Sequence, residues 1–309
     1  MHELTENNHL KWYLLDSSYN YKKYFASRTS STEIFGLDLG RDNSGNVGLW
    51  RYEFENAVSK IVENFGTKLN VFYSGGFDSE ILVRTLVKLG VKPFVHTIEF
   101  VRGENIDETK NAKVVCEELG LKQTIWKHNV QDYFLNKEYL DLGVKYKCSQ
   151  MAYLTVLKYI QKCTDYTCLL GGEIYCQKHA VDKLEAVPTR YDWYYIYREN
   201  EDAVTYRYYI DTGHPVINEV FSYTPSLIKS WFKIPTINSI VTDKTPGKLS
   251  LLSSKKQIFK EAYPSRLQAD TKLHGYEKLL ALNQIVTNEL LHLIEKPLVA
   301  KIPVCTLIN

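Results

Sequence analysis

The sequence lacks the patterns that most readily identify a nucleotide-binding or membrane protein. Neither a Gly-x4-Gly-Lys-Ser/Thr loop nor a Gly-x-Gly-x-x-Gly fingerprint occurs in its 309 residues, which excludes the two most familiar phosphate-binding motifs. It also has no run of 18 apolar residues and no apolar segment among its first residues. We therefore expect a cytoplasmic protein that does not insert into a membrane.

Cysteine pairs and metal-binding spacings are absent as well. The six cysteines form no Cys-x-x-Cys, so free and mostly buried thiols are expected rather than disulfides. The eight histidines show neither His-x-His nor His-Glu-x-x-His spacing, which argues against a zinc site. A net charge of +2 argues against a dedicated polyanion-binding protein and leaves local basic patches open.

Apolar runs that alternate with amphipathic segments begin near Lys68. This alternation predicts a parallel sheet covered by helices on both faces, an α/β doubly wound fold. Ligands bind beyond the carboxyl ends of such strands, here after Tyr73, Phe100 and Leu170. The expected strands are 69–73, 93–100, 123–127 and 167–170, and the expected helices are 52–65, 80–89, 107–119, 130–142, 149–162, 225–232, 253–263 and 276–294.

The domain organisation follows from the same pattern. Residues 1–66 are expected to form an N-terminal arm, and 67–309 the sheet domain with a helical C-terminal region. In the helix near 80–89, Glu80, Arg84 and Lys88 share one face at i, i+4 spacing, and this face is expected to point outward.

Residues 190–210 interrupt the pattern with alternating aromatic residues on both sides of a polar turn, which predicts a β-hairpin insertion. Base stacking on its tyrosines is one interpretation. The acidic turn Glu199–Asp202 would repel phosphates, so packing is favoured.

The most informative segment is Ser-Gly-Gly-Phe-Asp-Ser at residues 74–79, which lies between an expected strand and an expected helix. The glycines allow a tight turn, and the amides at the start of the helix then point towards one anion. The serine hydroxyls add hydrogen-bond donors, and the Asp78 carboxylate suits a divalent metal.

This string resembles the Ser-Gly-Gly-x-Asp-Ser loop of the N-type ATP pyrophosphatases, the PP-loop superfamily, whose fold is adenine nucleotide alpha hydrolase-like. The resemblance implies that the loop holds the β- and γ-phosphates of ATP while the α-phosphate is attacked, with Mg²⁺ as the metal. It assigns nucleotide binding to Ser74, Gly75, Gly76, Phe77 and Ser79, and metal binding to Asp78.

Two further strand ends are similar to the synthetase domain of asparagine synthetase. At the first, Thr97 and Ile98 would contact adenosine. At the second, the segment Gly171-Gly172-Glu173 corresponds to the start of Ser-Gly-Glu-Gly-x-Asp-Glu, with Gly172 and Glu173 matching, so Gly171 and Gly172 would line the nucleotide site and Glu173 would orient the acceptor or assist the metal. The chain departs from the family here, because Cys176 and Gln177 stand where Asp and Glu are expected.

A basic region at 229–260 contains seven lysines and one acidic residue, Asp243. It resembles the family's C-terminal region, where a lysine at a helix start contacts the departing pyrophosphate. Lys255 and Lys256 are the candidates, since the preceding serines suit a helix N-cap. Lys256 and Lys260 also share a helix face, so a solvated surface remains the alternative.

The resemblance implies an ATP-dependent ligase that adenylates a carboxylate or carbonyl substrate, releases pyrophosphate and transfers the acyl group to ammonia or an amine. We expect no glutaminase half of the asparagine synthetase kind, because position 2 is His and not the nucleophilic Cys. Nitrogen would come from free ammonia, an amine or a separate glutaminase subunit. Modification of tRNA or a nucleobase, and a non-catalytic nucleotide-binding subunit, are the alternatives.

Overall fold

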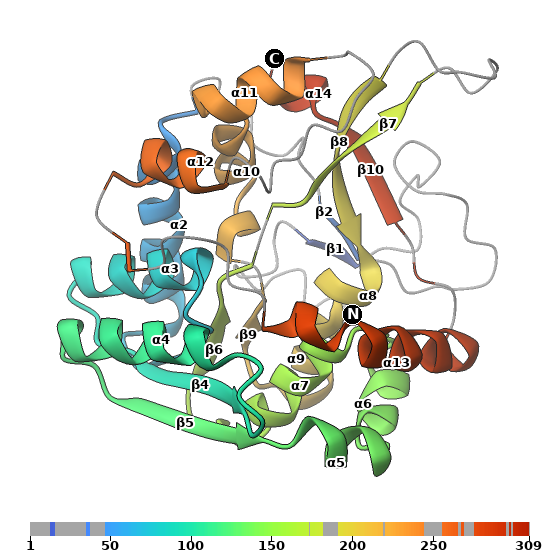
Figure 1. Ribbon diagram of the computed structural model, residues 1–309. Coiled ribbons are helices and arrows are strands. Elements are labelled where there is room, and N and C mark those ends of the chain that lie inside the picture. Colours follow the sequence, from blue (N-terminus) through green and yellow to red (C-terminus); the bar gives the residue numbers. More distant parts are fainter. Residues whose placement is uncertain are drawn as a thin grey trace.

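The main sheet of the protein is entirely parallel. The structure of the protein, a computed structural model, describes residues 13–15, 35–37, 47–172, 174–181, 191–218, 220–243, 255–264, 267–268, 275–294, 297 and 299–308 (Figure 1). The strands of the main sheet lie in the order β5-β4-β3-β6-β9. Their bounds are β3 (Leu69–Phe72), β4 (Phe94–Phe100), β5 (Gln123–His128), β6 (Thr167–Leu170) and β9 (Val216–Ile217).

The strand order creates a switch point beside β3. From β3 the chain proceeds to β4 and β5 on one side, and it later adds β6 and β9 on the other side. The crevice beyond the carboxyl ends of β3 and β6 is where open α/β sheets bind ligands. The predicted α/β parallel sheet is thus confirmed, and each of its four predicted strands matches an observed one to within about one residue at either end.

Helices cover both faces of the sheet because the central strand is apolar on both faces. Leu69, Val71 and Tyr73 enter one hydrophobic cluster, whereas Phe72 enters the other. The first cluster is completed by α2 (Trp50–Phe65), α3 (Phe77–Lys88), α4 (Ile106–Leu119), α10 (Pro225–Trp231), α11 (Pro235–Thr242) and α12 (Lys255–Ala262). The second contains α5 (Val130–Leu135), α6 (Tyr139–Lys145), α7 (Met151–Ile160), α9 (Val204–Thr212) and α13 (Leu280–Leu293).

A second, antiparallel sheet lies beside the main one, with the order β10-β8-β7 (Figure 1). In addition, β1 (Tyr13–Leu15) pairs with β2 (Phe35–Leu37). The remaining short helices are η2 (Val220–Ser222), α8 (Glu199–Asp202), η4 (Tyr276–Leu279) and α14 (Cys305–Ile308). The strands of the second sheet are β7 (Cys176–Ala180), β8 (Tyr191–Arg198) and β10 (Val299–Pro303). No helix in the described ranges is long and apolar enough to cross a membrane.

The predicted hairpin at 190–210 is wrong in its second half. Residues 191–198 form β8, but its partners are β7 and β10, and the residues after it form α8 and α9. The alternation in 204–210 was misleading because the first five residues of α9 are all buried: Val204 and Tyr208 enter the second cluster, and Tyr206 is also buried. The alternating apolar residues in 204–210 therefore result from burial on several faces of a helix and do not indicate a strand.

The expectation that Glu80 points outward is also wrong. Its side chain is fully buried, and it accepts a hydrogen bond from Arg84 Nε at 2.8 Å. The i, i+4 spacing is thus correct, whereas the exposure is not, because the C-terminal part of the chain covers this face of α3 near Gln268.

Candidate active site

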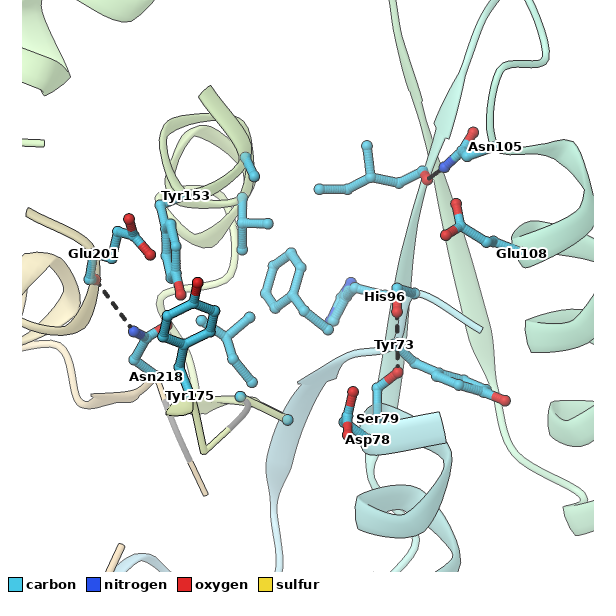
Figure 2. Close-up of a pocket in the computed structure, with 18 of the residues that line it drawn as sticks. Tyr73, Asp78, Ser79, His96, Asn105, Glu108, Tyr153, Tyr175, Glu201 and Asn218 are labelled. Carbon is cyan, nitrogen blue, oxygen red and sulfur yellow. Dashed lines mark hydrogen bonds between the residues drawn. The ribbon is translucent and has the colours of Figure 1, made fainter. Parts of the chain in front are cut away.

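A cavity of about 510 Å³ lies at the carboxyl ends of β3, β4 and β6 (Figure 2). Its position is the one that the strand order predicts for a ligand. The residues lining it are Phe72, Tyr73, Ser74, Asp78, Ser79, His96, Ile98, Phe100, Asn105, Glu108, Ala152, Tyr153, Val156, Leu170, Gly171, Gly172, Tyr175, Ile196, Arg198, Glu201 and Asn218.

The loop at residues 74–79 turns sharply because Gly75 adopts a φ of +95°. A Cβ atom there would lie 1.9 Å from the backbone oxygen of Glu108, so the loop is packed directly against the start of α4. The loop is also braced internally: the Ser74 and Ser79 hydroxyls lie 3.1 Å apart, and Ser79 Oγ donates to Gly76 O at 3.2 Å. Only glycine fits position 75.

The start of α3 has the properties of an anion site. Gly76 is its N-cap, and no side chain caps this helix start, where the backbone amides and the helix dipole favour an anion. Asp78 lies in the first turn and lines the cavity. The loop after β6 supports this turn, since a Cβ on Gly171 would lie 3.0 Å from Ser79 N. Two loops therefore meet closely at this end of the cavity.

Six of the residues proposed from the sequence reach the cavity: Ser74, Asp78, Ser79, Ile98, Gly171 and Gly172. Within the described part of the chain, the remaining cofactor-binding candidates lie behind that surface. Thr97 is buried, and its hydroxyl donates to Tyr73 O at 2.9 Å, which fixes β4 to the end of β3. Phe77 stacks on Phe259 of α12, with ring centroids 5.4 Å apart. Gly75 and Gly76 contribute the turn itself.

The other predicted catalytic residues are placed less completely. Glu173 lies outside the described residues, and so does the side chain of Lys255. Lys256 is exposed in the first turn of α12, which the Phe77–Phe259 stack holds against the start of α3. Cys176 opens β7, opposite Tyr195, and packs against the first cluster; the described lining of the cavity does not include it.

The edge of β4 forms an apolar side wall with one neutral histidine. Burial lowers the pKa of His96, so its ring is neutral. Its Nδ1 accepts from Trp126 Nε1 at 3.2 Å, which leaves Nε2 to donate to Asn70 Oδ1 at 3.0 Å. Next to it, Asn105 closes the strand end by accepting from Phe100 N and donating to Ile98 O. This rigid apolar wall suits a flat ring such as adenine.

Sequence reasoning missed the opposite wall, which consists of Tyr153, Tyr175, Ile196, Arg198, Glu201 and Asn218. Arg198 Nη1 donates to Glu201 Oε2 at 3.2 Å, and its guanidinium lies 4.0 Å from the centre of the Tyr175 ring. Burial raises the pKa of Glu201, an effect that Arg198 opposes. These residues come from distant segments with no shared motif, and only the acidic run at 199–202 gave a signal.

Comparisons with known proteins add little beyond the fold. No family model matches the sequence, and no curated protein matches it. A predicted subunit of tRNA methyltransferase from Methanocaldococcus jannaschii is 18% identical, with 63% of this chain and 87% of that one covered and a TM-score of 0.31. NH3-dependent NAD synthetase from Campylobacter jejuni is 18% identical over 40% of this chain and 56% of that one, with a TM-score of 0.29.

NMN synthetase from Francisella tularensis is 12% identical, with 80% of this chain and 95% of that one covered and a TM-score of 0.31. Similarities of this size carry no argument about activity. The fold therefore rests on the strand order, and the site on its own geometry.

Proposed function

We propose that the protein is an ATP-dependent ligase of the PP-loop type that forms AMP and pyrophosphate. It would adenylate a carboxylate or carbonyl substrate and pass the activated group to ammonia or an amine. The observation that carries this proposal is the joint position of Ser74, Asp78 and Ser79 at one end of the cavity, beside the N-terminus of α3, which no side chain caps. That arrangement is suited to a polyphosphate.

The proposal places two ligands side by side in the cavity. Phosphates at the loop would place the nucleotide base against the His96–Phe100 edge, with the α-phosphate between the two. The far wall would then hold the acceptor, as Figure 2 lets the reader follow from Ser79 across to Glu201. Catalysis would come mainly from positioning and from donors aimed at the leaving pyrophosphate.

The residues present fit Mg²⁺. No group of three or more candidate ligands that could hold a metal alone occurs among the described residues, and Asp78 supplies a single carboxylate at the loop. Magnesium in nucleotide sites characteristically takes one or two protein carboxylates and completes its shell with phosphate oxygens and water. When bound, it would neutralise charge on the leaving pyrophosphate.

The test is a screen of the purified protein for ATP cleavage in the presence of Mg²⁺ with carboxylates, amines and tRNA. The proposal predicts AMP and pyrophosphate in equal amounts, and only with a suitable acceptor. Release of ADP and inorganic phosphate would contradict it. Turnover with tRNA alone would favour nucleic-acid modification, and ATP binding without turnover would favour a non-catalytic subunit.

A further inference from the structure

The first turn of α4 brings a carboxylate side chain into the wall of the cavity, where phosphate binding does not explain it. Glu108 lines the cavity together with Asn105, three residues earlier, and with Asp78 and Ser79. In Figure 2, Glu108 lies between Asn105 on one side and Asp78 and Ser79 on the other. Its side chain is half-buried. A negative charge there repels phosphate, so its partner is a different part of a ligand.

The backbone around Glu108 has a fixed position between the loop at residues 74–79 and the end of β4. A Cβ atom on Gly75 would lie 1.9 Å from Glu108 O, so the loop and the first turn of α4 are in direct contact. Asn105, the N-cap of α4, binds the other side, because its carboxamide makes hydrogen bonds of 2.9 and 2.8 Å to the backbone at the end of β4. Glu108 is therefore placed at a set distance from both.

The carboxylate of Glu108 is held by a residue near the end of the chain. Gly275 N donates to Glu108 Oε1 at 3.3 Å. Gly275 approaches so closely that an added Cβ atom would lie 2.0 Å from Glu108 Oε2 and 2.5 Å from Asn105 Cβ. A carboxylate has about four lone-pair sites, so Glu108 can accept further O–H groups while it keeps the bond from Gly275.

The chemistry of this position fits a ribose. In ATP the sugar connects the phosphates to the base, and its neighbouring 2′- and 3′-hydroxyls are uncharged O–H donors. The proposed function has phosphates at the loop and the base at the edge of β4, which places the sugar between the two, beside Glu108. A carboxylate accepts hydroxyl groups in short, charge-assisted hydrogen bonds, and an Asp or Glu binds the ribose in this way in dinucleotide-binding folds.

We propose that Glu108 binds the sugar of the nucleotide by accepting a hydrogen bond from one or both ribose hydroxyls, and that Gly275 holds the carboxylate in position for this contact. The inference rests on the proposed function for the nucleotide, but it concerns binding and does not require turnover. It makes Glu108 a specificity-determining residue that favours ribonucleoside over deoxyribonucleoside triphosphates. The amino group of adenine is the competing partner, and the experiment separates the two.

The sugar contact is measured by calorimetric titration of the full chain with ATP, 2′-deoxy-ATP and 3′-deoxy-ATP, in the presence of Mg²⁺ and without an acceptor. The proposal predicts that loss of at least one hydroxyl weakens binding to the wild-type protein about tenfold, the effect of one charge-assisted hydrogen bond. Equal affinity of the wild-type protein for all three nucleotides would overturn it.

A double-mutant cycle assigns the contact to Glu108. Glu108→Ala should bind ATP and the weaker deoxy analogue within about twofold of each other, because the hydroxyl has lost its partner. Gly275→Ala keeps the carboxylate but displaces it, and should reduce the preference for ATP as well. Glu117→Ala, on an exposed face of the same helix, is the matched control and should keep the wild-type preference. The wild-type preference in Glu108→Ala, with an unchanged melting temperature, would refute the inference.

Purine riboside triphosphate, which keeps the ribose and lacks the amino group, tests the competing partner. If Glu108→Ala abolishes a preference for ATP over this analogue and leaves the preference over the deoxy analogues intact, Glu108 binds the base and the proposal is wrong. Release of ADP, with Glu108-dependent preference for the ribose retained, defeats the proposed function and leaves the sugar contact standing. Formation of AMP and pyrophosphate from ATP and both deoxy analogues with equal KM does the reverse.

Discussion

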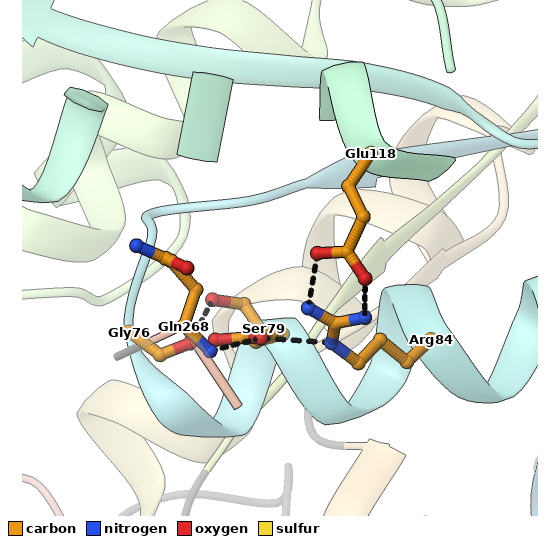
Figure 3. Close-up of polar contacts among 6 residues, drawn as sticks. Gly76, Ser79, Arg84, Glu118 and Gln268 are labelled. Atoms are coloured by element: carbon orange, nitrogen blue, oxygen red, sulfur yellow. Dashed lines mark hydrogen bonds and ion pairs between the residues drawn. The ribbon is translucent and has the colours of Figure 1, made fainter. Parts of the chain in front are cut away.

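Glu80, in the first turn of α3, accepts a hydrogen bond from the backbone amide of Gln268 at 2.7 Å, across 188 positions of sequence. The same oxygen accepts from Arg84 Nε at 2.8 Å, and Arg84 binds both oxygens of Glu118 at 2.9 Å (Figure 3). The network joins α3, the helix that follows the loop at residues 74–79, to α4 and to the C-terminal part of the chain.

Removing the buried carboxylate should destabilise the fold strongly. Glu80→Ala leaves Arg84 and the Gln268 amide without their shared acceptor, and we expect a loss of about 3 kcal/mol in the free energy of unfolding. Urea titration followed by fluorescence measures it. Glu117→Ala is the control, since Glu117 pairs with Lys113 at 3.9 Å on an exposed helix face, and it should cost less than about 0.5 kcal/mol. Equal losses in the two variants would contradict the network's role.

Gly75→Ala should lower the free energy of unfolding more than the same change at another glycine with positive φ. At Gly90, φ is +79° and nothing lies within 4 Å of the added Cβ, so backbone strain of about 1 kcal/mol is the whole cost. At Gly75 the Cβ would lie 1.9 Å from Glu108 O, and the loop must move, which adds about 2 kcal/mol. Chemical unfolding and ATP titration measure both effects. Retained ATP affinity in Gly75→Ala would show that the loop does not bind phosphate.

Removing either lysine at the start of α12 should lower the rate of pyrophosphate release, whereas removing Lys260 further along the helix should change it little. Lys255→Ala or Lys256→Ala should lower the rate of pyrophosphate release about tenfold or more through loss of one charge on a polyanion. Lys260→Ala changes an exposed lysine one turn later in the same helix and should stay within about twofold. Steady-state kinetics separate the outcomes. Equal effects at all three positions would support the solvated-face alternative.

His128 predicts a specific loss of stability in acid. Burial, together with the nearby Lys158, lowers its pKa to about 4 from 6.5, while Nδ1 lies 3.1 Å from Tyr159 Oη. As pH falls from 6.5 to 4, the unfolded chain takes up a proton that the folded one refuses, so stability decreases by up to about 3 kcal/mol. His128→Asn should show a flatter decline of melting temperature over this range. Parallel curves for the two proteins would contradict this assignment.

The sequence predicted the sheet well because its strands and helices are long and periodic. Apolar spacing was enough to predict strand β4. Helix α4 was predicted from its apolar spacing and from Gly120 at its end, which adopts a φ of +62°. Helix α9 resembled a strand in the sequence because residues 204–208 are all buried, so the burial of its first half follows no helical stripe. Strand β9, with two residues, is too short for any pattern to reveal.

The loop at one end of the cavity could be located from the sequence, since residues 74–79 are consecutive, whereas its binding of phosphate stays a prediction. The far wall could not be located, because Tyr153, Arg198 and Asn218 come from α7, β8 and the turn after β9. Their meeting depends on how β7 and β8 pair beside the main sheet, a tertiary arrangement that local spacing does not encode. Glu201 was read as part of an acidic turn for the same reason.

The most direct test of the account uses ATP labelled at the α-phosphorus, with Mg²⁺ and an acceptor found in the screen. The wild-type protein should convert the label to AMP. Asp78→Ala, which removes the carboxylate at the loop, should abolish that product, whereas Asp107→Ala, at an exposed position in the first turn of α4, should retain it. Label recovered as ADP, or AMP formed equally by Asp78→Ala, would contradict the central claim.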